Sequence, residues 1–526
     1  MTRMVKSKFR TIGVAAALAC VLALTGPAGA EKWSFGVMGD TQWVNSDMGV
    51  NNVSGTNSVA MDVIRAVNNE FIRQHVDFVV QVGDLCDTQS NAALQSRIDA
   101  NATLTAHGIA FYGLRGNHEN NATSLTFFRN NYIPGTTGYT NSSVNLPGVQ
   151  VSTDGATGNY SVTYNGIKIV MLDITVAEST ANMTSATAWM NTDLANSTYD
   201  HAFVFSHKNL LGQNHKDNLF GTGTTSANNE ANTNQQNAFF QALASNGVRY
   251  TISGHDHMHH RSLVRSPNYA TTGNQVNQLI CASDSTKFYN PADGYSTRET
   301  PLAQQLGTIG YYIFTIDGDQ VTIDYYATQH QGTYLANGNI VASPNWTRVE
   351  TFGYSTSGRS FLVNNGANFH EWDESPFLGT LMTLSGTNTN LTTQGGGPRA
   401  LSREINIGWA AGTGDCISDV LTIWGMEDIN GQTTGVPVAP TALPFELTLG
   451  YDADLYTEVY MMWQDREGDW HVLDNYTDNG DGTMTATVMP GGWGVFALGG
   501  TAVVPEPATL TLLALGGLTL IRRRNA

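Results

Sequence analysis

Short apolar segments alternate with amphipathic segments from Lys32 to about Tyr326. Trp33–Met38 has the composition of a strand. One helix face is then predicted by the spacing of Ala60, Val63, Ile64, Val67 and Phe71. Further strands are predicted at 77–82, 109–114, 167–172, 202–205 and 248–252, and further helices at 90–106, 184–195 and 233–245. Such alternation is typical of a layered α/β domain.

Three polar segments interrupt this alternation, at 43–57, 120–158 and 209–232. They are rich in Asn, Gly, Thr and Ser, so we predict long loops there. Loops of this length inside a compact domain are often functional, and each of these follows a segment that carries a motif described below. We therefore expect the three loops to shape a pocket.

Beyond about residue 345 the pattern changes to short β-type runs between Gly, Asn, Asp and Pro turns. Strands are predicted at 420–424, 445–449, 456–463, 469–473 and 483–488, and Asn479-Gly480-Asp481-Gly482 is a strong hairpin turn. A chain of 526 residues is long enough for two domains. We predict an α/β domain over 31–345 and a smaller β-rich, sandwich-like accessory domain over 350–503. Three tryptophans of the second domain are predicted to be core residues, with a sugar-stacking platform as the alternative: Trp463, Trp470 and Trp493.

The first 30 residues have the three parts of a secretory signal peptide. A basic start is followed by an apolar run over about 12–24, and Ala28-Gly29-Ala30 offers a cleavage site before Glu31. A membrane helix that stays attached is the alternative, but the apolar run is short for one. We therefore predict an exported, extracytoplasmic protein.

Charge and cysteine content narrow the possible partners. The formal net charge is −18, and the region between the basic ends is more acidic still. Such a surface repels polyanions, so general nucleic-acid binding is not expected. Three cysteines follow the predicted signal peptide, namely Cys86, Cys281 and Cys416. An odd number excludes a disulfide framework, although one bridge stays possible.

The last 23 residues, 504–526, combine a Pro-Glu-Pro motif, an apolar stretch and an arginine cluster. Val504-Pro505-Glu506-Pro507 precedes the apolar run at 509–521, and Arg522 to Arg524 follow it. This order resembles the PEP-CTERM sorting signal, although a plain hydrophobic end or marginal anchor is the simpler alternative. The resemblance implies recognition by an exosortase-type processing enzyme and attachment to, or release from, the surface of a Gram-negative bacterium that makes exopolysaccharide. Exopolysaccharide is therefore a further candidate partner.

Five polar motifs follow predicted strands of the α/β domain. They are Gly39-Asp40-Thr41-Gln42, Gly83-Asp84-Leu85-Cys86-Asp87, Gly116-Asn117-His118-Glu119, Ser206-His207 and Gly254-His255-Asp256-His257. Open α/β sheets bind ligands at the carboxyl ends of their strands. Asp, Asn and His supply oxygen and nitrogen donors that suit Mn, Zn or Fe. Two such ions can share one carboxylate, and Asp84 on the second strand is the natural bridge.

In their order and spacing these motifs resemble the calcineurin-like metallophosphoesterase family, over residues 36–257. The family pattern is D-x-H, G-D-x-x-D, G-N-H-[DE], a lone His and G-H-x-H. The resemblance implies a four-layer α/β/β/α sandwich with a dinuclear metal centre. One metal ion would be bound by Asp40, Asp84 and His257, and the second by Asp84, Asn117, His207 and His255.

The same resemblance implies roles for two further residues and contains one departure. His118 would be the general acid or a phosphate-stabilising donor, oriented by a carboxylate such as Asp87. Gln42 stands where the family has a histidine, so it either coordinates the first metal ion through its carbonyl or hydrogen-bonds a metal-bound water. The substitution leaves the identity of the metal open.

Several neighbouring residues are weaker candidates. Arg115 either contacts phosphate or is an exposed loop residue. We expect most of His215, His259 and His260 to support the site or lie on the surface, with substrate contact as the alternative. Cys86, between Asp84 and Asp87, is expected to pack beneath the site and not to bind metal.

The favoured function is hydrolysis of a phosphomonoester or phosphodiester by metal-bound hydroxide, because coordination lowers the pKa of water. The alternative is a non-catalytic cell-surface or matrix-binding protein on the same scaffold. Gln42 favours that alternative, whereas the intact acids and histidines of the other motifs disfavour it. The substrate does not follow from the sequence, because one fold hosts many phosphoesterases.

Overall fold

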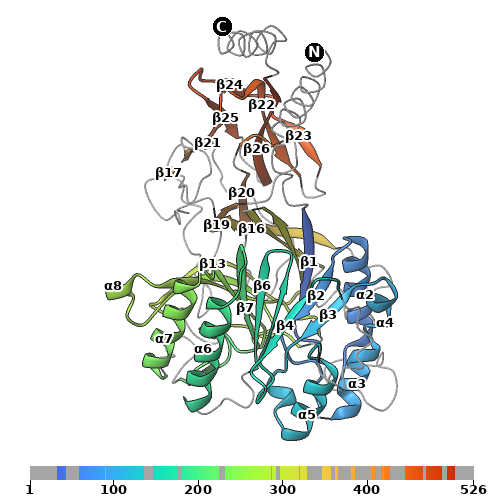
Figure 1. Cartoon of the computed structure of the whole chain (residues 1–526). Helices are drawn as coiled ribbons and strands as arrows, with labels where there is room; N and C mark the ends of the chain where they lie inside the picture. Colours follow the sequence, from blue (N-terminus) through green and yellow to red (C-terminus); the bar gives the residue numbers. More distant parts are fainter. Residues whose placement is uncertain are drawn as a thin grey trace, which may run out of the picture.

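The computed structural model describes residues 32–42, 58–88, 90–135, 146–173, 180–223, 231–285, 287–291, 296–318, 320–328, 346–356, 362–364, 381–384, 404–409, 416–418, 420–426, 445–465, 469–488 and 494–503. The predicted signal peptide, the sorting segment, the 43–57 loop and Trp493 lie outside these residues. Figure 1 shows an α/β part that contains all the helices of the described chain, and a β-only part at one end of it.

Two sheets form the centre of the α/β part. The first sheet has the order β16-β15-β14-β1-β2-β3, with β1, β2 and β3 parallel and the other strands antiparallel. Its strands are β1 (Trp33–Met38), β2 (Phe78–Gln81), β3 (Ala110–Gly113), β14 (Gly310–Asp317), β15 (Gln320–Ala327) and β16 (Thr347–Ser355). β1, β2 and β3 therefore end at the same edge of the sheet.

The second sheet has the order β13-β11-β12-β10-β7-β6-β5-β4, with a parallel centre formed by β6, β7, β10 and β12. Its strands are β4 (Gln150–Thr153), β5 (Tyr160–Tyr164), β6 (Ile167–Leu172), β7 (His201–Ser206), β10 (Tyr250–Ser253), β11 (His259–Arg265), β12 (Gln275–Ile280) and β13 (Glu299–Gln305). A separate two-stranded ribbon joins β8 (Asp217–Asn218) and β9 (Gly221–Thr222).

Helices flank the pair of sheets on opposite sides (Figure 1). Beside the first sheet lie α2 (Met61–Arg73), α3 (Asn91–Asp99), α4 (Ala102–Ala106) and α5 (Ala122–Asn131). Beside the second lie α6 (Thr180–Ala195) and α7 (Thr233–Ser245), and α8 (Tyr269–Thr272) follows β11. α2 buries the apolar face predicted from its sequence, and Gly36 makes room for Phe71, whose ring a β-carbon there would overlap at 2.5 Å.

The inner faces of the two sheets meet in an aromatic core. Phe35 of β1 stacks on Phe314 of β14, with ring centroids 4.8 Å apart, and contacts Phe203 of β7 at 5.9 Å. A second cluster joins β6 and β7 to α6 and α7, and includes Val170, Met190 and Phe239. Burial of both faces of each sheet confirms the predicted four-layer α/β/β/α sandwich.

Two local predictions were wrong. The helix expected at 90–106 is interrupted at Ala100 and Asn101, where buried hydrogen bonds compete with the helix: Asn68 Nδ2 donates to the Ala100 carbonyl (3.1 Å), and Arg97 donates to Asn101 Oδ1 (2.6 Å). The loop expected at 120–158 contains α5 and β4. Asn121 caps α5 by accepting a hydrogen bond from the Ser124 N–H (2.7 Å), a start signal that its polar composition concealed.

The C-terminal part is built from two five-stranded sheets. One contains β17 (Leu362–Asn364), β18 (Leu381–Leu384), β21 (Phe445–Gly450), β24 (Tyr476–Asp478) and β25 (Thr483–Val488), and the other β19 (Glu404–Trp409), β20 (Leu421–Met426), β22 (Tyr456–Gln464), β23 (Trp470–Val472) and β26 (Gly494–Ala502). Their buried residues, such as Leu447, Met484 and Phe496, share one cluster, so the part is β-rich and sandwich-like. The predicted hairpin turn at 479–482 connects β24 to β25, which pair in antiparallel.

β16 crosses the position at which the sequence predicted the second domain to begin. It pairs with β15 from Thr347 to Ser355 with one register shift, and Phe352 and Tyr354 belong to the core of the α/β part. Arg348 of the same strand donates to the Gln464 side chain (3.2 Å) of β22. The first sheet therefore continues past residue 350 and contacts the C-terminal part.

Two further findings concern the chain as a whole. Within the part of the chain that the structure describes, Cys86, Cys281 and Cys416 are not joined by a disulfide. Among the described residues, no helix combines the length and hydrophobicity that crossing a membrane requires.

Candidate functional site

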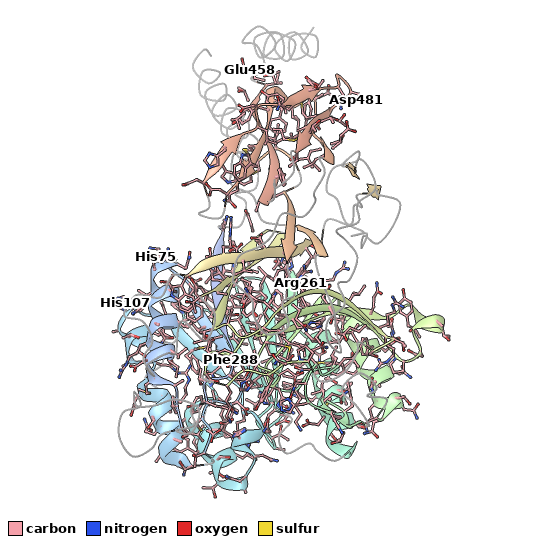
Figure 2. All side chains as sticks on the ribbon, turned by 180° about the vertical axis from the view of Figure 1, so that it is seen from behind. His75, His107, Arg261, Phe288, Glu458 and Asp481 are labelled. Atoms are coloured by element: carbon pink, nitrogen blue, oxygen red, sulfur yellow. The ribbon has the colours of Figure 1, made fainter. Side chains whose placement is uncertain are left out.

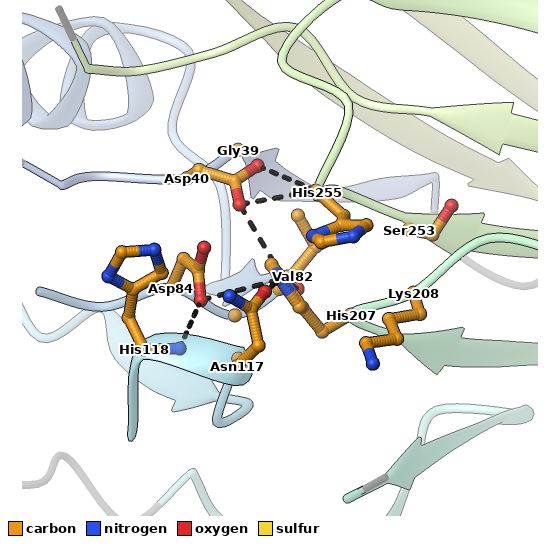
Figure 3. Close-up of polar contacts among 12 residues, drawn as sticks. Gly39, Asp40, Val82, Asp84, Asn117, His118, His207, Lys208, Ser253 and His255 are labelled. Atoms are coloured by element: carbon orange, nitrogen blue, oxygen red, sulfur yellow. Dashed lines mark hydrogen bonds and ion pairs between the residues drawn. The ribbon is translucent and has the colours of Figure 1, made fainter. Parts of the chain in front are cut away.

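The polar motifs meet where the parallel strands of both sheets end. Asp40 follows β1, Asp84 follows β2 and Asn117 follows β3, while His207 follows β7 and His255 follows β10. Figure 3 shows these side chains facing a common centre between the first and second sheets. The convergence predicted from the sequence therefore exists, and each sheet supplies part of it.

The possible ligand atoms fall into two groups that share one carboxylate. Asp40, Asp84 and His257 form the first metal group, and Asp84, His207 and His255 form the second. Within each group the atoms lie within 4.8 Å of one another, and all five residues are buried. Asn117 adds to the second metal group, because its Oδ1 lies 2.9 Å from His207 Nε2.

Backbone carbonyls orient two of the histidines. His207 Nδ1 lies 3.1 Å from the Val82 carbonyl, and His257 Nδ1 lies 3.0 Å from the Lys287 carbonyl. Since a carbonyl can only accept, both Nδ1 atoms are assigned a proton, which leaves Nε2 as the nitrogen of each ring that can bind metal. These Nε2 atoms face carboxylates, at 3.3 Å from Asp84 and 3.6 Å from Asp40, as a metal ligand should.

Close backbone contacts fix the two central carboxylates. Asp84 Oδ1 accepts from the His118 N–H (3.1 Å), and Asp40 accepts from the His255 N–H (3.2 Å). A β-carbon at Gly116 would lie only 1.9 Å from Asp84 Oδ1. The glycines of the motifs therefore provide the space in which the carboxylates lie.

Gln42 reaches the centre through the side chain of Asp84. Its Nε2 donates to Asp84 Oδ2, and its buried Oε1 has no hydrogen-bond partner. A buried carbonyl oxygen without a partner is costly, and coordination of a cation would satisfy it. The environment of Gln42 thus fits either role that the sequence left open for it.

The pKa values reflect a crowded, desolvated set of charges. Burial, which Asp84 reinforces, raises the pKa of Asp40 to about 7. Burial also acts to raise the pKa of Asp84, but the attraction to His207 opposes it, and this pKa lies below its ordinary value. For His207, burial alone would lower the pKa, but the negative charge of Asp84 raises it to about 9. The site therefore brings oxygen and nitrogen donors together and buries carboxylates whose negative charge water does not solvate. Two metal cations would balance that charge and use those donors.

The raised pKa of His207 predicts a loss of stability in the metal-free protein as the pH rises from about 7 to 9. His207 binds its proton more tightly in the folded than in the unfolded state, so its contribution to stability is lost between its ordinary pKa of 6.5 and about 9. Asp40 acts in the same sense, but mainly between its ordinary pKa of 3.8 and about 7. His257, whose pKa burial lowers to about 3, acts in the opposite sense, but only below its ordinary value of 6.5. We expect the melting temperature in chelator to fall over this pH range.

The same measurement on metal-loaded protein provides the control. Bound cations keep these ligands deprotonated, so the fall should become shallower or disappear. A melting temperature that stays level or rises between pH 7 and 9 in chelator would contradict the assignment of this proton to His207.

His118 lies beside the two metal groups and belongs to neither. Its Nδ1 is 2.9 Å from the backbone carbonyl of Asp87 and 3.4 Å from the Asp87 carboxylate, and its side chain is 30% exposed. The contact between His118 and Asp87 expected from the sequence is thus present, mainly through the backbone. Asp87 Oδ1 also accepts from Lys287 Nζ at 2.5 Å.

Most weaker candidates have structural partners. Arg115 is fully buried and pairs with Asp173 (2.5 Å), so it does not reach the opening of the site. His259 stacks on Tyr325, and His260 contacts Glu299 (2.8 Å); both histidines are buried, and neither belongs to a metal group. Cys86 packs beneath the site as expected, and its Sγ lies 3.3 Å from Glu119.

His215 differs from these residues because it stays near the centre. Its Nδ1 lies 2.6 Å from Asp256 Oδ1, and its ring stacks on that of His255 with centroids 4.1 Å apart. Asp256 also accepts from Asn209 and from the backbone of Gln213. Asp256, which lies between the two histidines of the last motif, therefore connects the 209–223 segment to the site.

Sequence reasoning missed four residues around the centre. Glu119 accepts from the backbone of both Gly116 (2.7 Å) and Cys86 (2.9 Å), which joins the second and third motifs. Asp284 accepts from the Gly39 N–H (2.8 Å). Asp217 lies 3.3 Å from His255 Nε2 and also pairs with Lys208, while Lys287 binds Asp87. Only Glu119 had a signal, as the acid of the Gly-Asn-His-Glu motif.

Comparisons with known sequences agree with the motifs. The sequence model of the calcineurin-like phosphoesterase family matches residues 34–259, and that of the PEP-CTERM protein-sorting motif matches residues 503–525. No curated protein matches the chain.

Several solved structures are similar to the chain at low identity. One is purple acid phosphatase PPD1 from yellow lupin (14% identity, TM-score 0.40), which aligns over 63% of this chain and 55% of its own. PhoD aligns at 12% identity and a TM-score of 0.39, over 62% of this chain and 71% of its own. GAP50, described as the anchor in the inner membrane complex of Plasmodium, aligns at 10% identity and a TM-score of 0.38, over 62% and 89%.

Proposed function

Because residues 34–259 form a calcineurin-like phosphoesterase domain, we propose that the protein is an exported phosphoesterase with two metal ions. The observation that carries the proposal is the sharing of Asp84 between two buried groups of possible ligands. A surface-bound or matrix-binding domain has no need of such a group, whereas two-metal hydrolysis requires one.

The proposed ligands follow the two groups. Asp40, Asp84 and His257 would bind the first ion, with Gln42 as a weaker neutral ligand whose unpaired Oε1 is available. The second ion would be bound by Asp84, Asn117, His207 and His255. When bound, the two ions would supply Lewis-acid stabilisation of the phosphoryl charge and an activated water. Mn, Zn and Fe all suit this donor set.

The protein's own residues would orient the ester and move a proton. His118 would donate a hydrogen bond to the phosphoryl group or a proton to the leaving oxygen, because it is the partly exposed histidine beside the two groups. The Asp87 carbonyl, 2.9 Å from Nδ1, would fix the ring and leave Nε2 for the substrate. Buried His207 and His257 are held by carbonyls and would serve as ligands.

Metal-dependent turnover tests the proposal. Purified protein from residue 31 to 503 would be stripped with chelator and then given Mn, Zn, Fe or Mg, and the hydrolysis of p-nitrophenyl phosphate and of its bis-ester would be followed. We expect at least one metal to restore turnover, because bound metal activates water near neutral pH. Protein that binds two ions and hydrolyses neither ester would favour the non-catalytic surface protein that Gln42 suggests.

The location of this activity follows from the chain's C-terminal motif. The PEP-CTERM match implies export and sorting to the cell surface. We propose that the first 30 residues direct that export, that an exosortase-type enzyme removes the tail, and that the source is a Gram-negative bacterium. The β-rich accessory part would then hold the enzyme near its phosphate-ester substrate, with exopolysaccharide as a candidate matrix.

A further inference from the structure

Lys287 lies on a segment that edges the first metal group. In this segment Asp284 accepts from the Gly39 N–H at 2.8 Å, and the Lys287 carbonyl lies 3.0 Å from His257 Nδ1. The Lys287 N–H donates to Ser285 Oγ (3.0 Å). Phe288, labelled in Figure 2, packs against the core of the α/β part. The backbone of Lys287 is therefore fixed beside a metal ligand.

The side chain of Lys287 reaches the surroundings of His118. Its Nζ donates to Asp87 Oδ1 at 2.5 Å, and the same oxygen lies 3.4 Å from His118 Nδ1. Both nitrogens contact one carboxylate oxygen, so an ammonium and an imidazole lie close together. Lys287 is 16% exposed and Asp87 24% exposed, which leaves this corner open to a solute.

The other cations around the centre have different surroundings. Arg115 is fully buried against Asp173. Lys208 is almost buried and pairs with Asp217 (2.8 Å), the carboxylate that also contacts His255. Of these three cations, Lys287 is the one that combines partial exposure with a position next to His118.

We propose that Lys287 binds a phosphoryl oxygen of the substrate and thereby makes the site selective for phosphomonoesters. The inference rests on the proposed phosphoesterase function. A monoester carries close to two negative charges at neutral pH, because its second pKa is about 6. A diester carries one charge and places a second substituent on the phosphorus. Lys287 and His118 offer hydrogen-bond donors on the two sides of Asp87, and the Lys287 ammonium matches the additional anionic oxygen of a monoester.

Selectivity between two esters tests the proposal. Lys287→Met should lower kcat/KM for p-nitrophenyl phosphate by about 10- to 100-fold, since one charge-assisted hydrogen bond is lost. Turnover of the bis-ester should change by less than about threefold, because the extra anionic oxygen is absent from it. Lys287→Arg should keep most of the selectivity, and Lys216→Met, at an exposed lysine, is the matched control.

A binding measurement separates this inference from the catalytic proposal. Calorimetry on metal-loaded protein would compare inorganic phosphate with dimethyl phosphate, so it gives an answer even if the wild type hydrolyses neither ester. Loss of phosphate affinity in Lys287→Met, with unchanged dimethyl phosphate binding and metal content, supports the inference. Equal losses for both anions, or no loss for either, would overturn it. Should the methionine variant fail to fold, Lys287→Gln takes its place with the same expectations.

Discussion

Asp84→Asn is expected to abolish hydrolysis and to lower the occupancy of both metal ions together. Asp84 is the one residue common to the two metal groups, and it is buried among His207, the His118 N–H and Gln42. An amide keeps the shape but loses the charge, and it turns an –NH2 donor toward one neighbour. We expect kcat/KM to fall by at least about 1,000-fold, beyond the 10- to 100-fold typical of residues that only orient ligands.

Metal content and turnover, measured on the same preparation, check this prediction. Asp77→Asn is the matched control, because Asp77 precedes the same strand at its other end and accepts from Tyr164 (2.9 Å), far from the motifs. The control should load two ions and keep its turnover. If Asp84→Asn keeps one ion at full occupancy, the two groups bind their ions independently. That result would contradict the prediction that Asp84 is a ligand of both ions.

His118→Asn should produce the second largest loss of activity, but unlike Asp84→Asn it should leave the metal content unchanged. Because His118 belongs to neither metal group, both ions should remain bound while kcat falls by about 100- to 10,000-fold. His107→Asn, at an exposed histidine of the α4 C-terminus, serves as control. A kcat that is unchanged for both an alkyl phosphate and p-nitrophenyl phosphate would exclude His118 from the reaction.

The choice of ester separates the two roles that His118 could have. p-Nitrophenolate leaves without help from an acid, whereas an alkoxide requires a proton. If His118 is the general acid, the loss should be much greater for an alkyl phosphate than for p-nitrophenyl phosphate. A donor that only stabilises the phosphoryl group would give similar losses for both esters.

The strand ends and the meeting of their polar residues at one edge could be predicted because each depends on local sequence, whereas the division of the ligands into two metal groups came from the resemblance to the family. A Gly-Asp or Gly-Asn-His after an apolar run marks both the end of a strand and a polar side chain at the sheet edge. Parallel strands then bring Asp40, Asp84 and Asn117 together without further information. The layered α/β fold follows from the same alternation of strands and helices, and the resemblance to the family implied the four layers that the structure confirms.

The remaining features depend on contacts between distant parts of the chain. Lys287 and Asp87 are 200 residues apart, and nothing near Lys287 in the sequence indicates a partner. Asp217 lies in a segment predicted only as a loop, yet it contacts His255. The break between α3 and α4 depends on Asn68, a residue of another helix. Periodicity reports which face of an element is buried, but not which polar atom lies opposite it.

Three of the proposed ligands have a left-handed backbone conformation, which residues other than glycine rarely adopt. The φ angles are +43° at Asp84, +70° at His255 and +49° at His257. Such conformations cost about 1–3 kcal/mol each, so replacing these residues by glycine would relieve the backbone while deleting a ligand. Directed evolution for thermostability alone would therefore tend to favour inactive variants. Selection for higher thermostability in this protein should therefore be combined with selection for metal binding.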